Sequence, residues 1–174
     1  MNCTIECEYD IIRKKLKYGK IKIQVDNNST EIEIFVGFNY RHVYIENSLL
    51  GKSINVVNRL GSWIQDINVE IIDKNVLINN KKRYFCKTIP FIFWEMLIKL
   101  PQYMKEYQKN EVCTFPVFDD KFTFINIYMI RKVSDVKYII LAPITIEVSY
   151  DSQGRIKSYG DINVEGFVCR NSMV

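Results

Sequence analysis

The single histidine of this chain, His42, limits the catalytic chemistry open to it. A hydrolytic triad needs a base that is half deprotonated near neutral pH, and histidine is its usual source. His42 stands between Tyr40 and Tyr44 at a spacing that places all three side chains on one face of a strand. Cys86 or Cys113 would be the thiolate partner, but neither has a local catalytic signature. We therefore expect no catalytic residues, and we interpret His42 as part of an aromatic stripe.

Two short motifs resemble phosphate-binding and metal-binding sequences. Gly51-Lys52-Ser53 resembles the end of a P-loop, but Glu46 stands where that motif requires a glycine, and its carboxylate would repel phosphate. Asp119 and Asp120 are candidate ligands of a metal-dependent nuclease, yet adjacent residues on an extended chain point to opposite sides. We interpret both segments as turns, and we expect no cofactor and no bound metal.

The five cysteines favour a reducing compartment, because an odd number without an export signal is typical of free thiols. Cys3 and Cys7 have a spacing found in some zinc sites, but no second pair of ligands accompanies them. The longest apolar run, 89–100, contains two charges and is shorter than the about 20 residues of a membrane span. These features predict a cytoplasmic protein that does not enter a membrane.

Exposed aromatic side chains near acids suggest a protein-binding surface, since tyrosine, tryptophan and arginine carry much of the energy of protein interfaces. The chain has a formal net charge of +4, so an acidic contact surface requires that its acids gather on one face. The candidate partner-binding residues are Glu31, Glu33, Tyr40, Tyr44, Glu46, Tyr103 and Tyr107.

Basic residues beside aromatic ones offer an alternative, because lysines neutralise phosphates while aromatic rings stack on bases. The candidate nucleic-acid-binding residues are Lys81, Lys82, Arg83 and Tyr84. A solvated turn followed by core aromatic residues explains this cluster better, and dispersed acids weaken a continuous basic track.

The composition predicts β-sheet: the chain has 26 Ile and 15 Val, against 8 Leu and 1 Ala. Alternating apolar and polar residues on both sides of 26–29 predict a hairpin closed at Val25 and Thr30, with Ile23 opposite Ile32 and Lys22 opposite Glu33. Further strands are expected in 41–46, 63–72, 76–78 and 83–86, whereas 47–62 is ambiguous.

The spacing of apolar residues changes after residue 86 from the alternation typical of strands to a pattern typical of a helix. Thr88 and Pro90 suit a helix start, Phe91 to Leu100 is apolar nearly all round, and Pro101 should end or kink the helix. The expected layout is one domain, 1–174, of the α+β class. It has a β-rich block at 18–86, a helical part at 88–109 and a β-rich block at 112–169. Both predominantly antiparallel blocks pack around one buried central helix with a Pro-interrupted extension.

By elimination, the sequence favours a non-enzymatic protein-binding module. The most specific form of this hypothesis is an immunity or inhibitor protein that neutralises a cognate toxin by binding it. A nucleic-acid-binding or regulatory accessory protein is the alternative.

Overall fold

The computed structural model describes residues 5–13, 16–49, 51–160 and 165–173, most of which lie in strands. The chain divides into two compact units. The first comprises residues 1–9, 18–89 and 170–174, and the second comprises residues 10–17 and 90–169.

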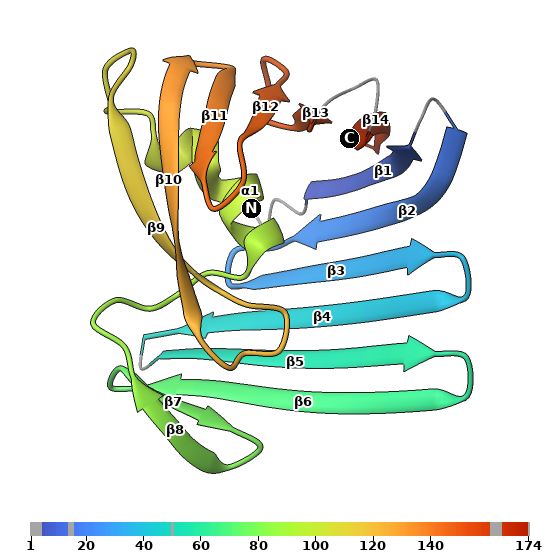
Figure 1. The fold of residues 1–174 in the computed structure, drawn as a ribbon, viewed down its shortest axis with the longest axis vertical. Coiled ribbons are helices and arrows are strands. Elements are labelled where there is room, and N and C mark those ends of the chain that lie inside the picture. The colour runs from blue at the N-terminus through green and yellow to red at the C-terminus, as the bar shows by residue number, and fades with distance from the viewer. Residues whose placement is uncertain (1–4, 14–15, 50, 161–164, 174) are drawn as a thin grey trace. The chain divides into compact units, whose positions relative to one another are not determined.

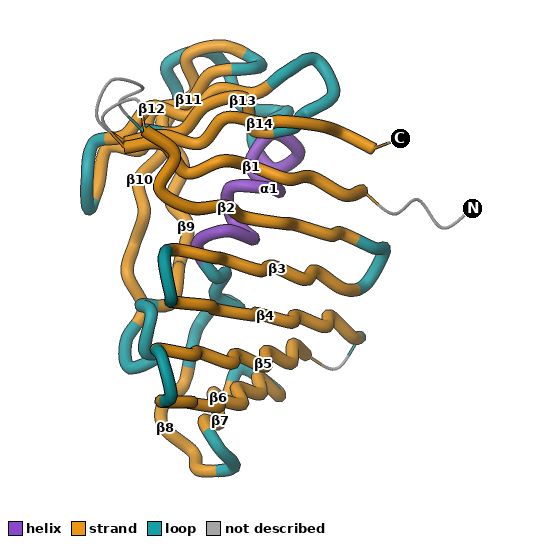
Figure 2. The backbone as a smooth tube through the Cα atoms, turned by 90° about the vertical axis from the view of Figure 1, so that its right-hand side faces the viewer, coloured by secondary structure: helices purple, strands orange, loops and turns teal. Residues whose placement is uncertain are grey.

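A meander of antiparallel strands makes up most of the first unit, with each strand from β2 to β8 paired to the next along the chain (Figures 1 and 2). The nine-stranded sheet has the order β14-β1-β2-β3-β4-β5-β6-β7-β8. Its strands are β1 (Ile5–Arg13), β2 (Leu16–Val25), β3 (Ser29–Val36), β4 (Asn39–Ser48), β5 (Gly51–Leu60), β6 (Trp63–Ile72), β7 (Asn75–Ile78), β8 (Lys81–Phe85) and β14 (Glu165–Met173).

The hairpin predicted from the alternating pattern is confirmed in its register. Val25 pairs with Thr30, Ile23 with Ile32 and Lys22 with Glu33. Ile23 and Ile32 are both buried, whereas Nζ of Lys22 lies 4.0 Å from Oε2 of Glu33 on the opposite face. The strands expected in 41–46, 63–72, 76–78 and 83–86 correspond to β4, β6, β7 and β8.

Strand β5 occupies most of the segment that the sequence left ambiguous. It follows that the interpretation of Gly51-Lys52-Ser53 as a turn is wrong, because these residues begin the strand. Gly51 pairs with Ile72, and a Cβ atom at Gly51 would overlap the carbonyl oxygen of Ile71. The glycine is therefore explained by the close approach of two strands.

The second unit contains a five-stranded antiparallel sheet and a helix, α1 (Phe93–Tyr103). The strands are β9 (Val112–Phe118), β10 (Ile125–Ser134), β11 (Lys137–Ala142), β12 (Ile146–Tyr150) and β13 (Ile156–Tyr159), in the order β13-β12-β11-β10-β9. Helix α1 packs on one face of this sheet, where the ring of Phe93 lies 5.5 Å from that of Tyr128 and 5.6 Å from that of Tyr159.

Helix α1 is shorter than the helical part expected at 88–109. Its N-cap is Ile92 and not Thr88, because the preceding backbone belongs to the sheet: the N–H of Phe91 donates to the carbonyl of Pro116 at 2.9 Å. The expected Pro-interrupted extension is also wrong, since the helix continues through Pro101 to Tyr103 and gives way to turns.

Tyr150 explains how Pro101 is accommodated inside the helix. Proline has no N–H to donate to the carbonyl four residues earlier, which here belongs to Leu97. The hydroxyl of Tyr150 donates to that carbonyl at 2.6 Å, and both residues are buried. A side chain of β12 thus replaces the hydrogen bond that the helix backbone lacks.

Lys132 of β10, which is only 5% exposed, supplies hydrogen bonds to carbonyl groups at the C-terminal end of α1. Its ammonium donates to the carbonyls of Met104 at 3.2 Å and Lys105 at 3.4 Å, and it forms an ion pair with Asp135 at 2.8 Å. A cation is favoured here, because the unpaired carbonyls at a helix C-terminus carry partial negative charge.

The α+β class with predominantly antiparallel sheet is confirmed, with one helix among the described residues. That both β-rich blocks pack around a central helix stays a prediction, as does the expectation of a single domain.

Candidate binding face

Strands β2 to β6 carry their apolar side chains on one face and most of their polar side chains on the other. On the apolar face, Ile21, Ile32, Val43, Ile54 and Val69 are at most 1% exposed. We name the opposite side the polar face. By register it comprises Lys20, Lys22, Gln24, Glu31, Glu33, Phe35, Tyr40, His42, Tyr44, Glu46, Ser53, Asn55, Val57, Arg59, Ile64, Asp66, Asn68 and Glu70.

A row of cations and aromatic rings crosses the polar face near the β3–β4 turn. Lys20, Phe35, Tyr40, Arg59 and Ile64 are consecutive cross-strand partners on five strands. The Nζ of Lys20 lies 5.1 Å from the ring centre of Phe35, the two aromatic rings are 4.8 Å apart, and the guanidinium carbon of Arg59 lies 6.0 Å from the ring centre of Tyr40. Cation–π attraction, about 0.5–1 kcal/mol at exposed sites, favours these positions of the two cations.

Hydrogen bonds connect this row to the acids of β3. The hydroxyl of Tyr40 donates to Oε1 of Glu33 at 2.8 Å. Burial raises the pKa of Tyr40 to about 12, and the hydrogen bond to Glu33 and the charge of that carboxylate act in the same direction. Nε2 of His42 lies 2.6 Å from Oε1 of Glu31, and the His42 ring stacks beside Tyr40 with 6.4 Å between centroids. The central side chains of the face are thus held by one another.

The polar face is acidic on a chain that is basic as a whole. It carries Glu31, Glu33, Glu46, Asp66 and Glu70 against Lys20, Lys22 and Arg59, which is two more acids than lysines and arginines. The formal charge of the chain is +4. The gathering of acids that an acidic contact surface requires is therefore present.

Five of the seven predicted partner-binding residues lie together on this face, namely Glu31, Glu33, Tyr40, Tyr44 and Glu46. The other two belong to the second unit. The ring of Tyr103 packs against Phe91 at 5.3 Å, and the hydroxyl of Tyr107 accepts a hydrogen bond from Sγ of Cys113 at 3.0 Å. Tyr103 and Tyr107 are therefore not part of the polar face.

The predicted nucleic-acid-binding cluster falls on β8. Lys81 is exposed, whereas Tyr84 pairs with the fully buried Val76 and is half-buried itself. The side chains of Lys82 and Arg83 lie outside the described part of the chain. The position of Tyr84 opposite a core residue is that of a structural aromatic residue and not of an exposed stacking platform.

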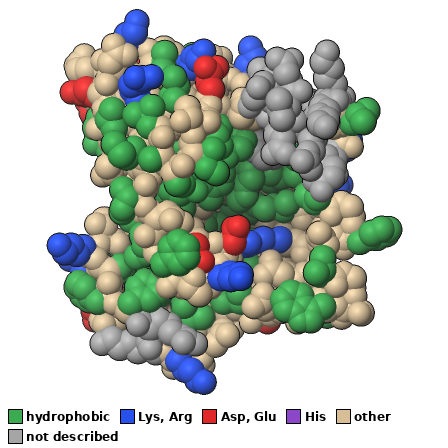
Figure 3. All heavy atoms as spheres, in the orientation of Figure 1, with side chains coloured by type: hydrophobic (Ala, Val, Ile, Leu, Met, Phe, Trp, Pro, Cys, Tyr) green, Lys and Arg blue, Asp and Glu red, His purple; other side chains and the backbone are tan. Residues whose placement is uncertain are grey.

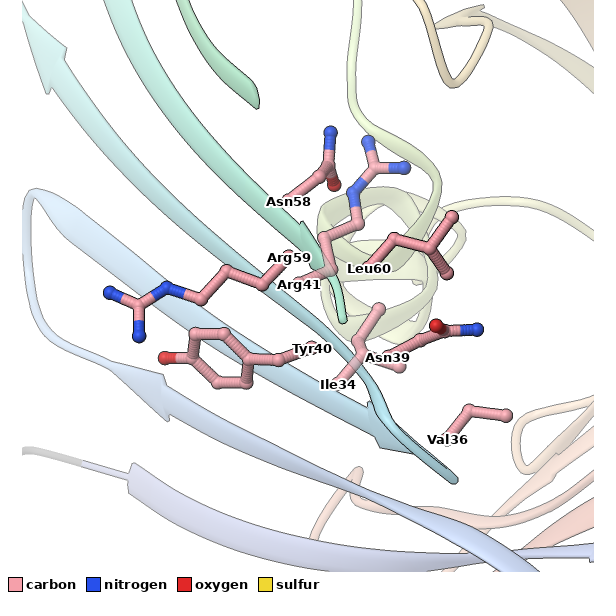
Figure 4. Close-up of a pocket in the computed structure, with 8 residues that line it drawn as sticks. All are labelled: Ile34, Val36, Asn39, Tyr40, Arg41, Asn58, Arg59 and Leu60. Carbon is pink, nitrogen blue, oxygen red and sulfur yellow. The ribbon is translucent and has the colours of Figure 1, made fainter. Parts of the chain in front are cut away.

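A shallow pocket of about 210 Å³ lies at the end of β3 to β5 (Figure 4). The side chains of Tyr40 and Arg59 point away from those of Arg41, Asn58 and Leu60, which lie on the other side of the strands. Sites for cofactors and drug-sized ligands usually measure about 300–1,000 Å³. This pocket is smaller, so we assign no cofactor to it.

The residues considered for catalysis are engaged in other contacts. His42 bonds to Glu31, whereas Cys86 is buried, donates its Sγ–H to the carbonyl of Lys74 at 3.3 Å and has its pKa raised by burial. Among the described residues, no group of three His, Cys, Asp or Glu side chains is arranged to hold a metal. The side chains of Cys3 and Cys7, considered for zinc, lie outside the described residues.

Asp119 holds the β9–β10 loop together, as the predicted turn requires. Its carboxylate accepts hydrogen bonds from the N–H of Thr123 at 2.6 Å, of Phe124 at 2.9 Å and of Lys121 at 3.3 Å. Burial alone would raise the pKa of Asp119, but these hydrogen bonds outweigh it and lower the pKa below its ordinary value. The carboxylate of Asp119 therefore stabilises the β9–β10 loop.

Sequence reasoning missed the contributions of Arg59, Phe35 and Lys20 to this face. Arg59 lies in the segment whose strand was not recognised, and the two others were read only as the alternating partners of apolar residues. The alternation of Ile54 and Val56 is a signal from which β5, and with it the position of Arg59, would follow.

Among the described residues, no helix combines the length and hydropathy needed to cross a bilayer. Comparison with protein-family models, with curated proteins and with solved structures finds no match.

Proposed function

We propose that this protein is a non-enzymatic binding module of the cytoplasm that contacts a protein partner through its polar face. The observation that carries the proposal is the gathering of acids and half-exposed aromatic residues on one face of β2 to β6. In its most specific form, the protein is an immunity or inhibitor protein that neutralises a cognate toxin by covering its active site.

The charge of the polar face favours a partner with a basic surface. Electrostatic complementarity speeds association and selects among partners more than it adds affinity. Glu46 and Glu70 lie on either side of Ser53 and make no ion pair with described residues, so their carboxylates are available to a partner. Cationic side chains on the partner would pair with them.

The aromatic part of the face supplies anchors of the kind that dominate interface energies. The hydrogen bond to Glu33 holds Tyr40 in place, so little of its side-chain entropy is lost when it is covered, and the guanidinium of Arg59 lies over its ring. At the β6 end of this row, the apolar side chain of Ile64 is 61% exposed. This combination of rigid aromatic residues and an acidic surround supports a protein ligand.

The test uses the product of the gene adjacent to the one that encodes this protein, co-expressed and co-purified with it. We expect a stable complex and rescue of growth when the neighbour is toxic. Glu46→Lys should weaken the complex by at least roughly tenfold, because a partner cation would then face a like charge. Glu106→Lys is the matched control, since Glu106 is exposed in the turn after α1 and belongs to the second unit, whereas the polar face belongs to the first.

Two outcomes would contradict the proposal. One is a protein that neither binds nor neutralises the neighbouring product, and the other is a complex in which Glu46→Lys and Glu106→Lys behave alike. Binding to a labelled single-stranded oligonucleotide that weakens steeply with salt would instead support the nucleic-acid alternative.

A further inference from the structure

The face of the five-stranded sheet that lies opposite α1 exposes apolar side chains. Val112 of β9 is 43% exposed, and Ile127 and Met129 of β10 are 55% and 41% exposed. Ile139 of β11 lies on the same face, because it pairs with Arg131. We name this the Ile139 face. Figure 3 shows hydrophobic side chains grouped over β9 to β11 in that view.

Two opposite charges flank the centre of the Ile139 face. Arg131 of β10, Ile139 of β11 and Glu147 of β12 form one cross-strand row. Since neighbouring strands are about 4.8 Å apart, the two charged residues are separated by about 10 Å with Ile139 midway. The row thus carries a cation on one side of its centre and an anion at the same distance on the other, and Lys137 of β11 is a further cation on this face.

Neither charged group has its bonding capacity used up within the chain. The Nε of Arg131 is buried without a hydrogen-bond partner among the described residues. Glu147 forms an ion pair with Lys137 at 2.9 Å but remains 48% exposed, and a carboxylate accepts about four hydrogen bonds. A carboxylate from outside the chain would form a charge-assisted bond with the guanidinium nitrogens of Arg131 other than the buried Nε.

We propose that a second copy of this chain covers the Ile139 face, so that the protein forms a symmetric dimer by packing the two sheets face to face. A two-fold axis that runs along β11, midway between the sheets, exchanges the two sides of the row. Ile139 then meets Ile139 of the partner subunit, and Arg131 of each copy meets Glu147 of the partner subunit. The same axis brings Lys137 of β11 opposite Lys137 of the partner subunit, and each lysine stays paired with the Glu147 of its own chain at 2.9 Å. The two new ion pairs and the apolar contacts then form together in one symmetric arrangement.

The distances allow this arrangement. Packed sheets lie about 10 Å apart with their strands nearly aligned, which an extended arginine and a glutamate span together. An ordinary binding partner would need a matching pattern of its own, whereas a second copy supplies apolar residues and opposite charges in the required order. Self-complementarity of this kind is what an isologous interface requires.

The test measures oligomeric state by sedimentation equilibrium across a concentration series of the full chain. Arg131→Glu places two carboxylates at each contact, and Glu147→Arg places two guanidinium groups there. Each variant alone should dimerise at least roughly tenfold more weakly than the wild type. An equimolar mixture of Arg131→Glu and Glu147→Arg should recover dimers, because opposite charges then meet at both contacts.

Lys105→Glu is the control with the same change of charge, since its side chain is exposed in the turn after α1. A wild-type protein that stays monomeric throughout the series overturns the proposal. So does a dimer that withstands both single variants, or a mixture that fails to recover dimers although both variants retain native circular dichroism. Because this face and the polar face have no residue in common, failure here leaves the proposed partner binding untouched.

Discussion

Substituting Tyr150 by phenylalanine tests how the fold tolerates a proline inside its helix. The change removes only the hydroxyl that donates to the carbonyl of Leu97 at 2.6 Å. Pro101 has no N–H for this carbonyl, so no helical bond replaces the lost one. A buried acceptor left unsatisfied costs about 1–3 kcal/mol. For a chain of this size, 1 kcal/mol corresponds to a fall of about 2–4 °C in Tm.

The decisive measurement is a double-mutant cycle with Pro101→Ala, followed by urea and thermal unfolding. Alanine restores an N–H that reaches the Leu97 carbonyl, so Tyr150→Phe should cost less in that background. We expect a coupling energy of about 1 kcal/mol between the two positions. Tyr138→Phe is the matched control: its hydroxyl donates to the carbonyl of Asp135 at 3.0 Å, which Pro101 does not affect.

Two results would contradict this role of Tyr150. One is a change of less than about 0.5 kcal/mol in the free energy of unfolding on Tyr150→Phe, the range of ordinary surface substitutions. The other is a cost of Tyr150→Phe that is the same with proline and with alanine at position 101. Either result would mean that the carbonyl of Leu97 does not depend on the tyrosine.

Two further predictions concern charged groups of the second unit. Lys132→Met should lower the free energy of unfolding by about 1.5–3 kcal/mol, because the carbonyls of Met104 and Lys105 lose a charged donor. Urea unfolding measures this change, with Lys109→Met as the control, since Lys109 is exposed. An equal effect of the two substitutions would argue against the prediction. For Asp119 the folded state lowers the pKa, so its stabilising contribution is present above about pH 4 and is lost as the pH falls through the folded pKa. Asp119→Asn should therefore flatten the dependence of stability on pH below about pH 4, and acid-unfolding curves that change equally with pH in both proteins would contradict this.

The meander could be predicted from sequence wherever alternation is clean. Apolar residues at Ile21, Ile23, Ile32 and Ile34 determine the face, and the charges of Lys22 and Glu33 determine the register. Strand β5 was missed because its apolar-face positions include Lys52 and Asn58, so the alternation weakens at both ends. A buried lysine is explained only by contacts that a sequence does not reveal.

The helix boundaries depended on tertiary contacts in the same way. Thr88 and Pro90 are good local start signals, but the sheet takes the backbone of Phe91 and delays the helix. Pro101 is a good local stop signal, but Tyr150, distant in sequence, supplies the missing hydrogen bond. Local propensity identified the residues that start and stop helices, but it gave the wrong bounds for α1. Hydrogen bonds to residues distant in sequence set these bounds.

The candidate face was predictable in part. The acids of β3 and the tyrosines of β4 followed from alternation, and their gathering on one side follows from the register. The contribution of Arg59 required β5, and the separation of Tyr103 and Tyr107 from the face required knowledge of the second unit. Surface composition identified the residue types, and strand pairing determined which of them are neighbours.

The meander has a consequence for how the first unit is assembled. From β2 to β8, every pair of neighbouring strands is joined by a loop of only two or three residues. The entropy cost of closing each loop is therefore small and is similar for all of these loops. Each strand pairs with one that is close to it in sequence, so no pairing requires contact with a distant segment. In such a sheet each strand from β3 to β8 pairs with the strand that comes just before it in the chain. A hairpin gained or lost at the β8 end would change its width without altering the path of the rest.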